Sequence, residues 1–353
     1  MNNFFKKGRA AIFIPVALIL ILFSSLISCR ENGPQCIAAP ECKGDSAIRF
    51  AVIGDWGWWG QADQVKVANA MDKVGIDCPY DFIVSTGDNF YDAGVDSLGD
   101  VLWNISYENV YTGSHLQCPW YVVLGNHDYR GAPSAEIAYS LSNNRWKLPS
   151  KYYKEQFILG SGELLDLFFM DSNPYQKDLL GAGSAYPELS ALDTVYQNGW
   201  IENGLRNSSA NWKLVIGHHP LYTCGMRKTQ PQYMRKFEGL FNETHVDAYF
   251  CGHEHDLQVH KPPGSVTYFV SGGGGNKRPI QTPFDFTHFA QSSLGFMVVE
   301  VTNSIMTVTS YNENGQVLHV ESIVHYVFIN YICDKVKYCE QPIMDLVRLK
   351  PIL

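Results

Sequence analysis

Five times in this chain, a short apolar segment ends in residues that can bind metal ions. The segments cover residues 48–53, 82–85, 120–124, 213–216 and 248–251. The sequences that follow them are Gly54-Asp55-Trp56-Gly57, Gly87-Asp88-Asn89-Phe90-Tyr91, Gly125-Asn126-His127-Asp128, Gly217-His218-His219-Pro220 and Gly252-His253-Glu254-His255. Each apolar segment, together with the sequence that follows it, indicates a buried strand and then a sharp glycine turn. Because open α/β sheets bind their ligands at such strand ends, the pattern favours a metal site over ordinary packing.

Asp88 and Tyr91 are the most informative pair in these loops. A carboxylate at the end of a strand can bridge two cations. A phenol three residues later can reach the same place, but it ionises at neutral pH only beside a strong Lewis acid such as a trivalent metal. Together the two side chains favour a centre with two metal ions.

The composition excludes several classes of protein. The chain has 353 residues, of which 46% are hydrophobic and 18% charged, so it can bury a large core in one big domain or two smaller ones. It is neither disordered nor fibrous. The formal net charge is −8, and no segment offers a basic stripe, so we expect no nucleic acid partner.

The first 28 residues have the pattern of an export signal. Lys6, Lys7 and Arg9 precede an apolar run over residues 12–23, and small residues then lead to Cys29. This pattern resembles a bacterial lipoprotein signal, in which Cys29 becomes lipidated and can attach the protein to a membrane. An ordinary signal peptide or signal anchor is the alternative. We therefore expect a cell-envelope lipoprotein, in the periplasm or at the cell surface, or else a secreted protein.

Eight cysteines remain when Cys29 is set aside, a number that suits an exported protein. The local pairs Cys36 with Cys42 and Cys333 with Cys339 are candidate disulfides. Spacing alone does not fix the connectivity.

Strands and helices alternate after a polar linker over residues 29–46. A helical spacing of apolar residues over 61–75 lies between the strands 48–53 and 82–85, which predicts a βαβ unit with parallel pairing. The remaining expected elements are strands at 152–159 and 164–170, a Gly/Ser-rich loop at 172–184, a helix at 188–205, and strands at 267–270, 296–301, 306–311 and 317–323. We expect two packed sheets with helices outside, in a domain spanning 47–324. The tail, 325–353, has no assigned role.

The five motifs, together with Arg145-Trp146-Lys147-Leu148-Pro149-Ser150, resemble the purple acid phosphatases, most closely the small tartrate-resistant ones of the calcineurin-like metallophosphatase superfamily. Many metallophosphatases carry Asp-x-His in the first motif. This chain has Asp55-Trp56-Gly57 and supplies Tyr91 instead, the combination that marks the purple branch. The resemblance covers residues 48–323 approximately and implies the α/β metallophosphatase fold, a four-layer α/β/β/α sandwich of two mixed sheets.

The resemblance also implies a ligand set. Asp55, Tyr91 and His255 correspond to ligands of a ferric ion, and Asp88 corresponds to the bridge. The corresponding ligands of a divalent Fe, Zn or Mn ion are Asn126, His218 and His253. Two octahedral ions offer about twelve positions. Seven side chains, with the bridge counted twice, leave about four of these for water and substrate oxygens.

The implied activity is acid phosphatase chemistry, in which a metal-activated hydroxide attacks a phosphate monoester of a small molecule or a protein. By resemblance, Asn126 and His127 contact the substrate, His127 stabilises or protonates the leaving group, and Asp128 is a candidate to orient His127. We expect a monomer. The alternatives are a phosphodiesterase on the same site and a surface binding protein without activity.

One departure from the family concerns the loop after His218. The family places a further histidine there, but residues 221–228 read Leu-Tyr-Thr-Cys-Gly-Met-Arg-Lys, so His219 or Arg227 would have to contact the substrate instead. The segment 172–184 occupies the place of a family loop that can cover the site. For Trp56, Trp58 and Trp59 we expect packing or pocket walls rather than chemistry.

Overall fold

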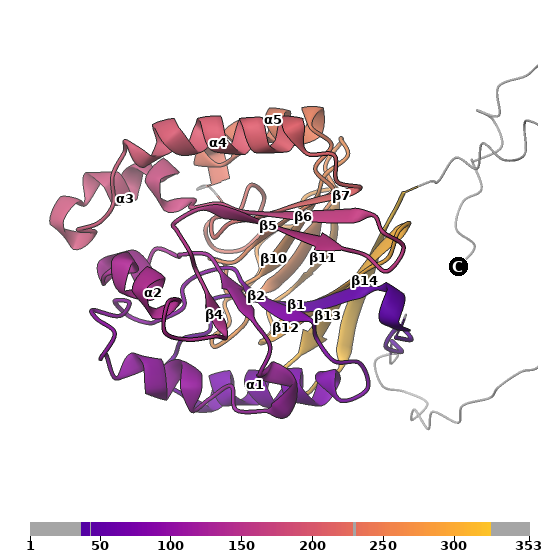
Figure 1. The fold of residues 1–353 in the computed structure, drawn as a ribbon, viewed down its shortest axis with the longest axis horizontal. Helices are drawn as coiled ribbons and strands as arrows, with labels where there is room; N and C mark the ends of the chain where they lie inside the picture. Colours follow the sequence, from indigo (N-terminus) through magenta and orange to yellow (C-terminus); the bar gives the residue numbers. More distant parts are fainter. Residues whose placement is uncertain (1–36, 43, 229–230, 326–353) are drawn as a thin grey trace, which may run out of the picture. The chain divides into compact units, whose positions relative to one another are not determined.

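Two seven-stranded sheets lie face to face in the computed structural model, which describes residues 37–42, 44–228 and 231–325 (Figure 1). The first sheet has the spatial order β14 (Val317–Val324), β13 (Ile305–Asn312), β12 (Gly295–Val301), β1 (Ile48–Ile53), β2 (Phe82–Ser85), β3 (Trp120–Val122) and β4 (Trp146–Lys147). The second has the order β11 (Thr287–Gln291), β9 (Leu257–His260), β10 (Thr267–Ser271), β8 (Ala248–Cys251), β7 (Trp212–Ile216), β6 (Leu164–Phe169) and β5 (Tyr153–Ile158). Both sheets mix parallel and antiparallel pairs.

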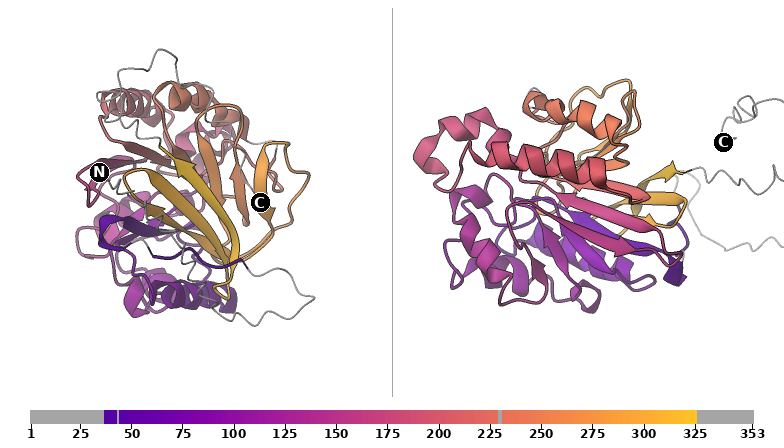
Figure 2. Two further views of the ribbon diagram at one scale, coloured as in Figure 1. Left: turned by 90° about the vertical axis from the view of Figure 1, so that its right-hand side faces the viewer. Right: turned by 45° about the horizontal axis from the view of Figure 1, so that its top comes forward.

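Helices cover the outer faces of both sheets, so the domain has four layers (Figure 2). The α-helices are α1 (Ala62–Gly75), α2 (Pro133–Tyr139), α3 (Lys177–Gly181), α4 (Asp193–Asn207) and α5 (Glu238–Glu243). Shorter helical turns are η1 (Gly44–Ser46), η2 (Trp103–Glu108), η3 (Ser114–Leu116), η4 (Asp128–Arg130), η5 (Asn173–Tyr175), η6 (Gly183–Ala185), η7 (Pro231–Tyr233) and η8 (Arg235–Phe237). The apolar side of α1 packs under the first sheet, while α4 and α5 pack on the second. The predicted four-layer α/β/β/α sandwich is confirmed.

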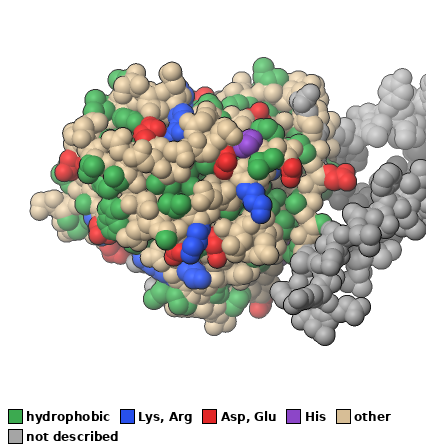
Figure 3. Space-filling view, turned by 90° about the horizontal axis from the view of Figure 1, so that it is seen from below, with side chains coloured by type: hydrophobic (Ala, Val, Ile, Leu, Met, Phe, Trp, Pro, Cys, Tyr) green, Lys and Arg blue, Asp and Glu red, His purple; other side chains and the backbone are tan. Residues whose placement is uncertain are grey.

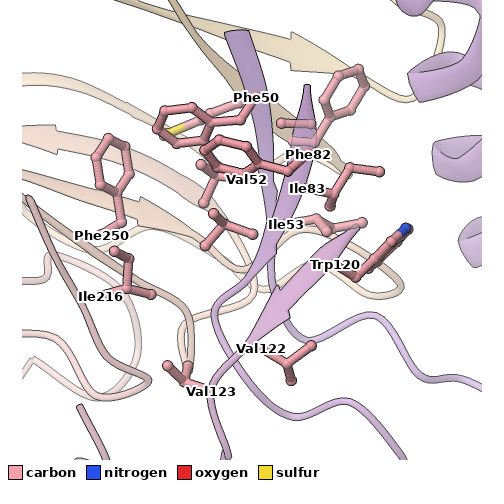
Figure 4. Packing of buried hydrophobic residues seen from close by; sticks show 14 of the residues in the cluster. Phe50, Val52, Ile53, Phe82, Ile83, Trp120, Val122, Val123, Ile216 and Phe250 are labelled. Atoms are coloured by element: carbon pink, nitrogen blue, oxygen red, sulfur yellow. The ribbon is translucent and has the colours of Figure 1, made fainter. Parts of the chain in front are cut away.

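The space between the sheets is filled by apolar side chains from both (Figure 4). Val52 and Ile53 of β1 lie near Ile216 of β7 and Phe250 of β8, and all four are fully buried. Fully burying such a side chain stabilises the fold by about 1.5–3 kcal/mol. The strands that carry the predicted site are therefore held firmly relative to one another.

The sequence placed most of these elements well. The predicted βαβ unit is present, with β1 and β2 parallel and Phe50 opposite Phe82. Three strands were not predicted, namely β4, β9 and β11. The helix expected at 188–205 begins at Asp193, because a turn in which the Ser190 hydroxyl accepts the Leu192 N–H precedes it. The expected loop at 172–184 contains α3 and two short turns.

The predicted disulfide between Cys36 and Cys42 is wrong, because Cys42 pairs with Cys78. The physical reason is the parallel pairing of β1 with β2, which brings the segments before both strands together. This disulfide joins the chain before β1 to the chain after α1. Cys118, Cys224 and Cys251 are free thiols.

Several predictions concern residues outside the described ranges, namely the export signal, Cys29, the tail over 326–353, and the pair Cys333 with Cys339. Within the described part of the chain, every helix is too short or too polar to span a bilayer. On the face shown in Figure 3, basic and acidic side chains are interspersed.

Candidate metal centre

The five predicted loops meet at one edge of the sandwich. Strands β1, β2 and β3 are parallel neighbours in the first sheet, and β7 and β8 are parallel neighbours in the second. Their carboxyl ends deliver all seven predicted ligands, which are buried: Asp55, Asp88, Tyr91, Asn126, His218, His253 and His255.

The first cluster consists of Asp55, Asp88, Tyr91 and His255. The Tyr91 oxygen lies 3.0 Å from Asp55 Oδ1, 2.9 Å from Asp88 Oδ2 and 3.1 Å from His255 Nε2. His255 Nε2 is also 3.4 Å from Asp55 Oδ1. Four donor atoms from three loops therefore converge on one point.

The second cluster consists of Asp88, Asn126, His218 and His253. His218 Nε2 lies at its centre, 3.1 Å from His253 Nδ1, 3.3 Å from Asn126 Oδ1 and 3.5 Å from Asp88 Oδ1. Asp88 thus directs one carboxylate oxygen to each cluster. This is the arrangement expected of a bridging ligand.

These spacings fit a pair of metal ions. Neighbouring ligands of an octahedral ion with bonds near 2.1 Å are about 3.0 Å apart. Hydrogen bonds explain the first cluster less well, since the Tyr91 phenol has one proton and three acceptor atoms around its oxygen. A cation between the four donors would satisfy all of them.

The backbone is strained at three of the predicted ligands. Asp55, Asp88 and His253 have φ values of 57°, 52° and 70°, in the left-handed region that side chains rarely adopt. Such strain costs about 1–3 kcal/mol for each residue and clusters at functional sites. Gly252 is needed beside them, because a side chain there would collide with the Asp55 carboxylate.

Hydrogen bonds orient the ligands. His218 Nδ1 donates to the Thr86 carbonyl at 2.9 Å, which leaves the Nε2 lone pair for the second cluster. The His253 backbone N–H donates to Asp55 Oδ2 at 2.8 Å and so links loops from opposite sheets. These contacts position His218, Asp55 and the His253 backbone without using the atoms that face the clusters.

The electrostatic field of the site attracts cations. Burial opposes a charge on His218, yet the adjoining Asp88 carboxylate raises the pKa of His218 to about 9. Burial, with the Asp55 and Asp88 carboxylates, raises the pKa of the Tyr91 phenol well above 10. Only a nearby cation would therefore let Tyr91 ionise near neutral pH.

His127 lies beside the first cluster and is partly exposed. Its backbone N–H donates to Asp88 Oδ1 at 2.8 Å, and its ring centre is 4.3 Å from that of Tyr91. Its Nδ1 donates to the Asp92 carbonyl at 2.6 Å, which leaves Nε2 available. The Asp92 carbonyl, rather than Asp128, therefore orients this ring.

Asp128 has a different role from the one predicted. Its Oδ1 accepts the backbone N–H groups of Asn89 and Phe90, at 2.8 and 3.0 Å. Its Oδ2 accepts the Gly125 N–H at 2.7 Å and the Asn89 side-chain amide at 3.2 Å. The carboxylate thus joins the ligand-bearing loops after β2 and β3.

A pocket opens next to the second cluster. Its lining residues are Asn126, Gln176, Asp178, Leu179, His219, Arg227 and His253. The predicted substrate contacts His219 and Arg227 are therefore beside the ligands. Gln176, Asp178 and Leu179 were not predicted, and the only signal for them was the covering position of the segment 172–184.

Comparison with known proteins agrees with this geometry. Residues 48–257 match the family model described as "Calcineurin-like phosphoesterase". Purple acid phosphatase 4 of Arabidopsis thaliana is 33% identical over 332 residues, covering 90% of this chain and 95% of that protein. Tartrate-resistant acid phosphatase type 5 of Oryctolagus cuniculus is 31% identical over 320 residues, covering 85% of this chain and 95% of that protein.

Among solved structures, GAP50, the anchor in the inner membrane complex of Plasmodium, aligns with a TM-score of 0.68 and 22% identity, covering 79% of this chain and 89% of that one. A likeness at this identity shows the shared fold alone. The sequence relatives carry the assignment further, because they match over nearly their whole length. This chain belongs to the calcineurin-like phosphoesterases and, within them, to the purple acid phosphatases.

Proposed function

We propose that this protein is an exported phosphomonoesterase that works with a ferric ion in the first cluster and a divalent Fe, Zn or Mn ion in the second. The observation that carries the proposal is the position of Tyr91, whose oxygen lies within 3.1 Å of two carboxylates and one imidazole. A phenolate favours a trivalent ion over a divalent one. The names of the relatives, acid phosphatases, support phosphate monoesters as substrates.

The two ions, when bound, supply Lewis acidity that activates a water molecule and positive charge that holds the phosphoryl group. The residues of this chain do the rest. Because His127 Nδ1 donates to the Asp92 carbonyl, Nε2 carries a proton only when the ring is the imidazolium cation. In that form Nε2 can donate to a phosphoryl oxygen or pass its proton to the leaving oxygen.

His219 and Arg227 take the place of the missing family histidine in this proposal. The Ser172 hydroxyl accepts the N–H groups of His218 and His219, so its own hydrogen is free to point to His219 Nδ1 at 2.8 Å. His219 Nε2 then carries a proton that it can donate to a phosphate oxygen. Arg227, fixed by hydrogen bonds to the His253 carbonyl and the Glu254 carboxylate, adds a positive charge to the same pocket.

The proposal is tested by the colour, the metal content and the kinetics of the purified protein. We expect about one iron and one divalent ion per chain, a visible tyrosinate-to-iron band, and a higher kcat/KM for an aryl monoester than for a matched diester. Tyr91→Phe should abolish the band. A colourless protein that contains zinc alone would contradict the ferric assignment, and a preference for the diester would favour a phosphodiesterase.

Export is the second part of the proposal. The basic residues before the apolar run and the position of Cys29 support a lipidated protein of the cell envelope, with a secreted protein as the alternative. Metabolic labelling with a fatty acid should mark the wild type and not Cys29→Ser. An unlabelled protein in the culture medium would favour secretion without an anchor.

A further inference from the structure

Trp58 contacts all three ligands that belong to the first cluster alone. Its indole stacks on the Tyr91 ring, with ring centres 4.2 Å apart and an angle of 22° between the planes. Its Nε1 donates to the Asp55 carbonyl at 3.0 Å. The indole and the His255 ring are nearly perpendicular, with ring centres 6.0 Å apart and an angle of 82° between the planes. One side chain therefore links its own loop after β1 to the two other loops that supply donor atoms to the first cluster.

The surroundings hold Trp58 in this position. Gly275 lies against the indole so closely that a side chain there would collide with Trp58 Cδ1. Trp59 packs edge-on to it, with ring centres 5.8 Å apart at 89°. The ring and hydrogen-bond contacts of the Trp58 side chain involve only Asp55, Tyr91, His255 and Trp59 among the residues the structure describes.

Each contact has a physical consequence for the ion. The indole covers part of the Tyr91 ring, so water cannot reach that side and the phenol cannot rotate away from the cluster. The hydrogen bond to the Asp55 carbonyl supports the left-handed turn that aims the Asp55 carboxylate. Groups that orient metal ligands typically change metal affinity about 10- to 100-fold when they are removed.

We propose that Trp58 is a positioning residue for the first metal ion, which slows the loss of that ion and sets the energy of the tyrosinate-to-metal absorption. The inference rests on the proposed two-metal function. It goes beyond that function by assigning Trp58 to the ligands of one of the two ions. The second cluster shares only Asp88 with the first, and Trp58 stacks on or hydrogen-bonds none of its other members, Asn126, His218 and His253, so retention of the second ion should not depend on Trp58.

The experiment compares metal loss from the metal-loaded full chain in the wild type, Trp58→Phe and Trp58→Leu. A chelator is added, and both ions are followed with time by elemental analysis, alongside the visible spectrum. Trp200→Leu is the matched control, since Trp200 is also a partly buried tryptophan but packs on Tyr152 and Phe168. Circular dichroism checks that all variants are folded.

We expect Trp58→Leu to release one of the two ions about 10- to 100-fold faster and to shift the visible band, while the second ion leaves at the wild-type rate. Trp58→Phe keeps a stacked ring and loses the indole N–H, so its effect should be smaller. Wild-type release and an unchanged band in Trp58→Leu would overturn the inference, and so would equal acceleration of both ions, which indicates general loosening.

These outcomes are separate from the failure of the proposed function. A colourless zinc protein whose Trp58→Leu variant loses one ion faster would remove the ferric assignment and keep the role of Trp58. A coloured, active wild type with an unaffected Trp58→Leu variant would keep the proposed function and remove the role of Trp58. A wild type that binds no metal would overturn both.

Discussion

Replacement of Asp128 by asparagine should loosen the metal site without removing any predicted ligand. Each carboxylate oxygen of Asp128 accepts two N–H donors from the loops that carry Asp88, Tyr91 and Asn126. An asparagine amide places an NH2 group where one oxygen was, so two donors lose their acceptor in either orientation. Asp128 is fully buried, and water cannot compensate.

The size of the effect follows from those hydrogen bonds. A buried donor left without an acceptor costs about 1–3 kcal/mol. The Asn89 side-chain amide keeps other acceptors, the Val123 carbonyl and Glu136, so the lower half of the summed range applies, roughly 2–4 kcal/mol. At about 2–4 °C per kcal/mol for a domain of this size, Tm should fall by roughly 4–16 °C. Metal affinity should fall about 10- to 100-fold.

The assay is calorimetry of the metal-free protein at pH 9, followed by metal titration. The alkaline pH matters because burial, together with the Asp88 carboxylate, raises the pKa of Asp128 to about 8 in the absence of metal. Asp63→Asn is the control, because Asp63 is exposed and its one ion pair within the described part of the chain is with Lys66 on α1, a solvent-screened surface contact. If Asp128→Asn unfolds at the same temperature as this control and binds metal normally, Asp128 does not hold the two loops.

Three further predictions address the pocket, the loss of stability at acid pH and the disulfide. Arg227→Gln should raise KM for an aryl phosphate monoester about 10- to 100-fold, because the pocket loses a charged hydrogen-bond donor. Lys228→Gln is the control and should leave KM unchanged, because Lys228 donates to the Thr282 carbonyl. Steady-state kinetics of both variants test this prediction. Burial opposes ionisation of Glu321, but His319, Lys261 and His288 lower its pKa from 4.5 to about 2. Its stabilising effect should be present above pH 4.5 and disappear as the pH falls towards 2, so that the Tm values of the wild type and Glu321→Gln converge in acid; a constant difference would contradict this. Cys78→Ser should lower stability by about 4 kcal/mol, since the Cys42–Cys78 bond closes a loop with a sequence separation of 36, and an unchanged midpoint in urea would show that the bond is dispensable.

The sequence predicted those parts of the site that follow from one strand and its loop. Strands β1, β2 and β8 begin and end where their apolar runs do, because they are buried on both faces and contain few polar residues. The glycine before each ligand group marked the turn. This pattern located the five loops, and the resemblance to the purple acid phosphatases picked out the seven ligands within them, which the structure brings together.

The parts that depend on contacts between distant segments could not be predicted. Strand β9 contains Gln258 and His260, which look exposed in the sequence but are buried, with His260 Nε2 donating to Gln258 Oε1 at 2.7 Å. Strand β11 alternates poorly and has an irregular register with β9. The role of Asp128 depends on the approach of the β2 and β3 loops, and the Cys42–Cys78 pairing depends on the β1–β2 register.

The site lies where the strand ends of the two sheets meet, which explains why it needs loops from both. Asp55, Asp88 and Asn126 come from the first sheet, whereas His218, His253 and His255 come from the second. Neither sheet alone carries a complete ligand set for one ion, because Asp55 and Tyr91 need His255, and Asn126 needs His218 and His253. Metal binding should therefore stabilise the contact between the sheets. Val52, Ile53, Ile216 and Phe250 belong to the strands that lead into three of the ligand loops, so their packing should influence the spacing of the ligands. A volume change in that core should act on the chemistry through the same strand ends, since close-packed interiors transmit strain.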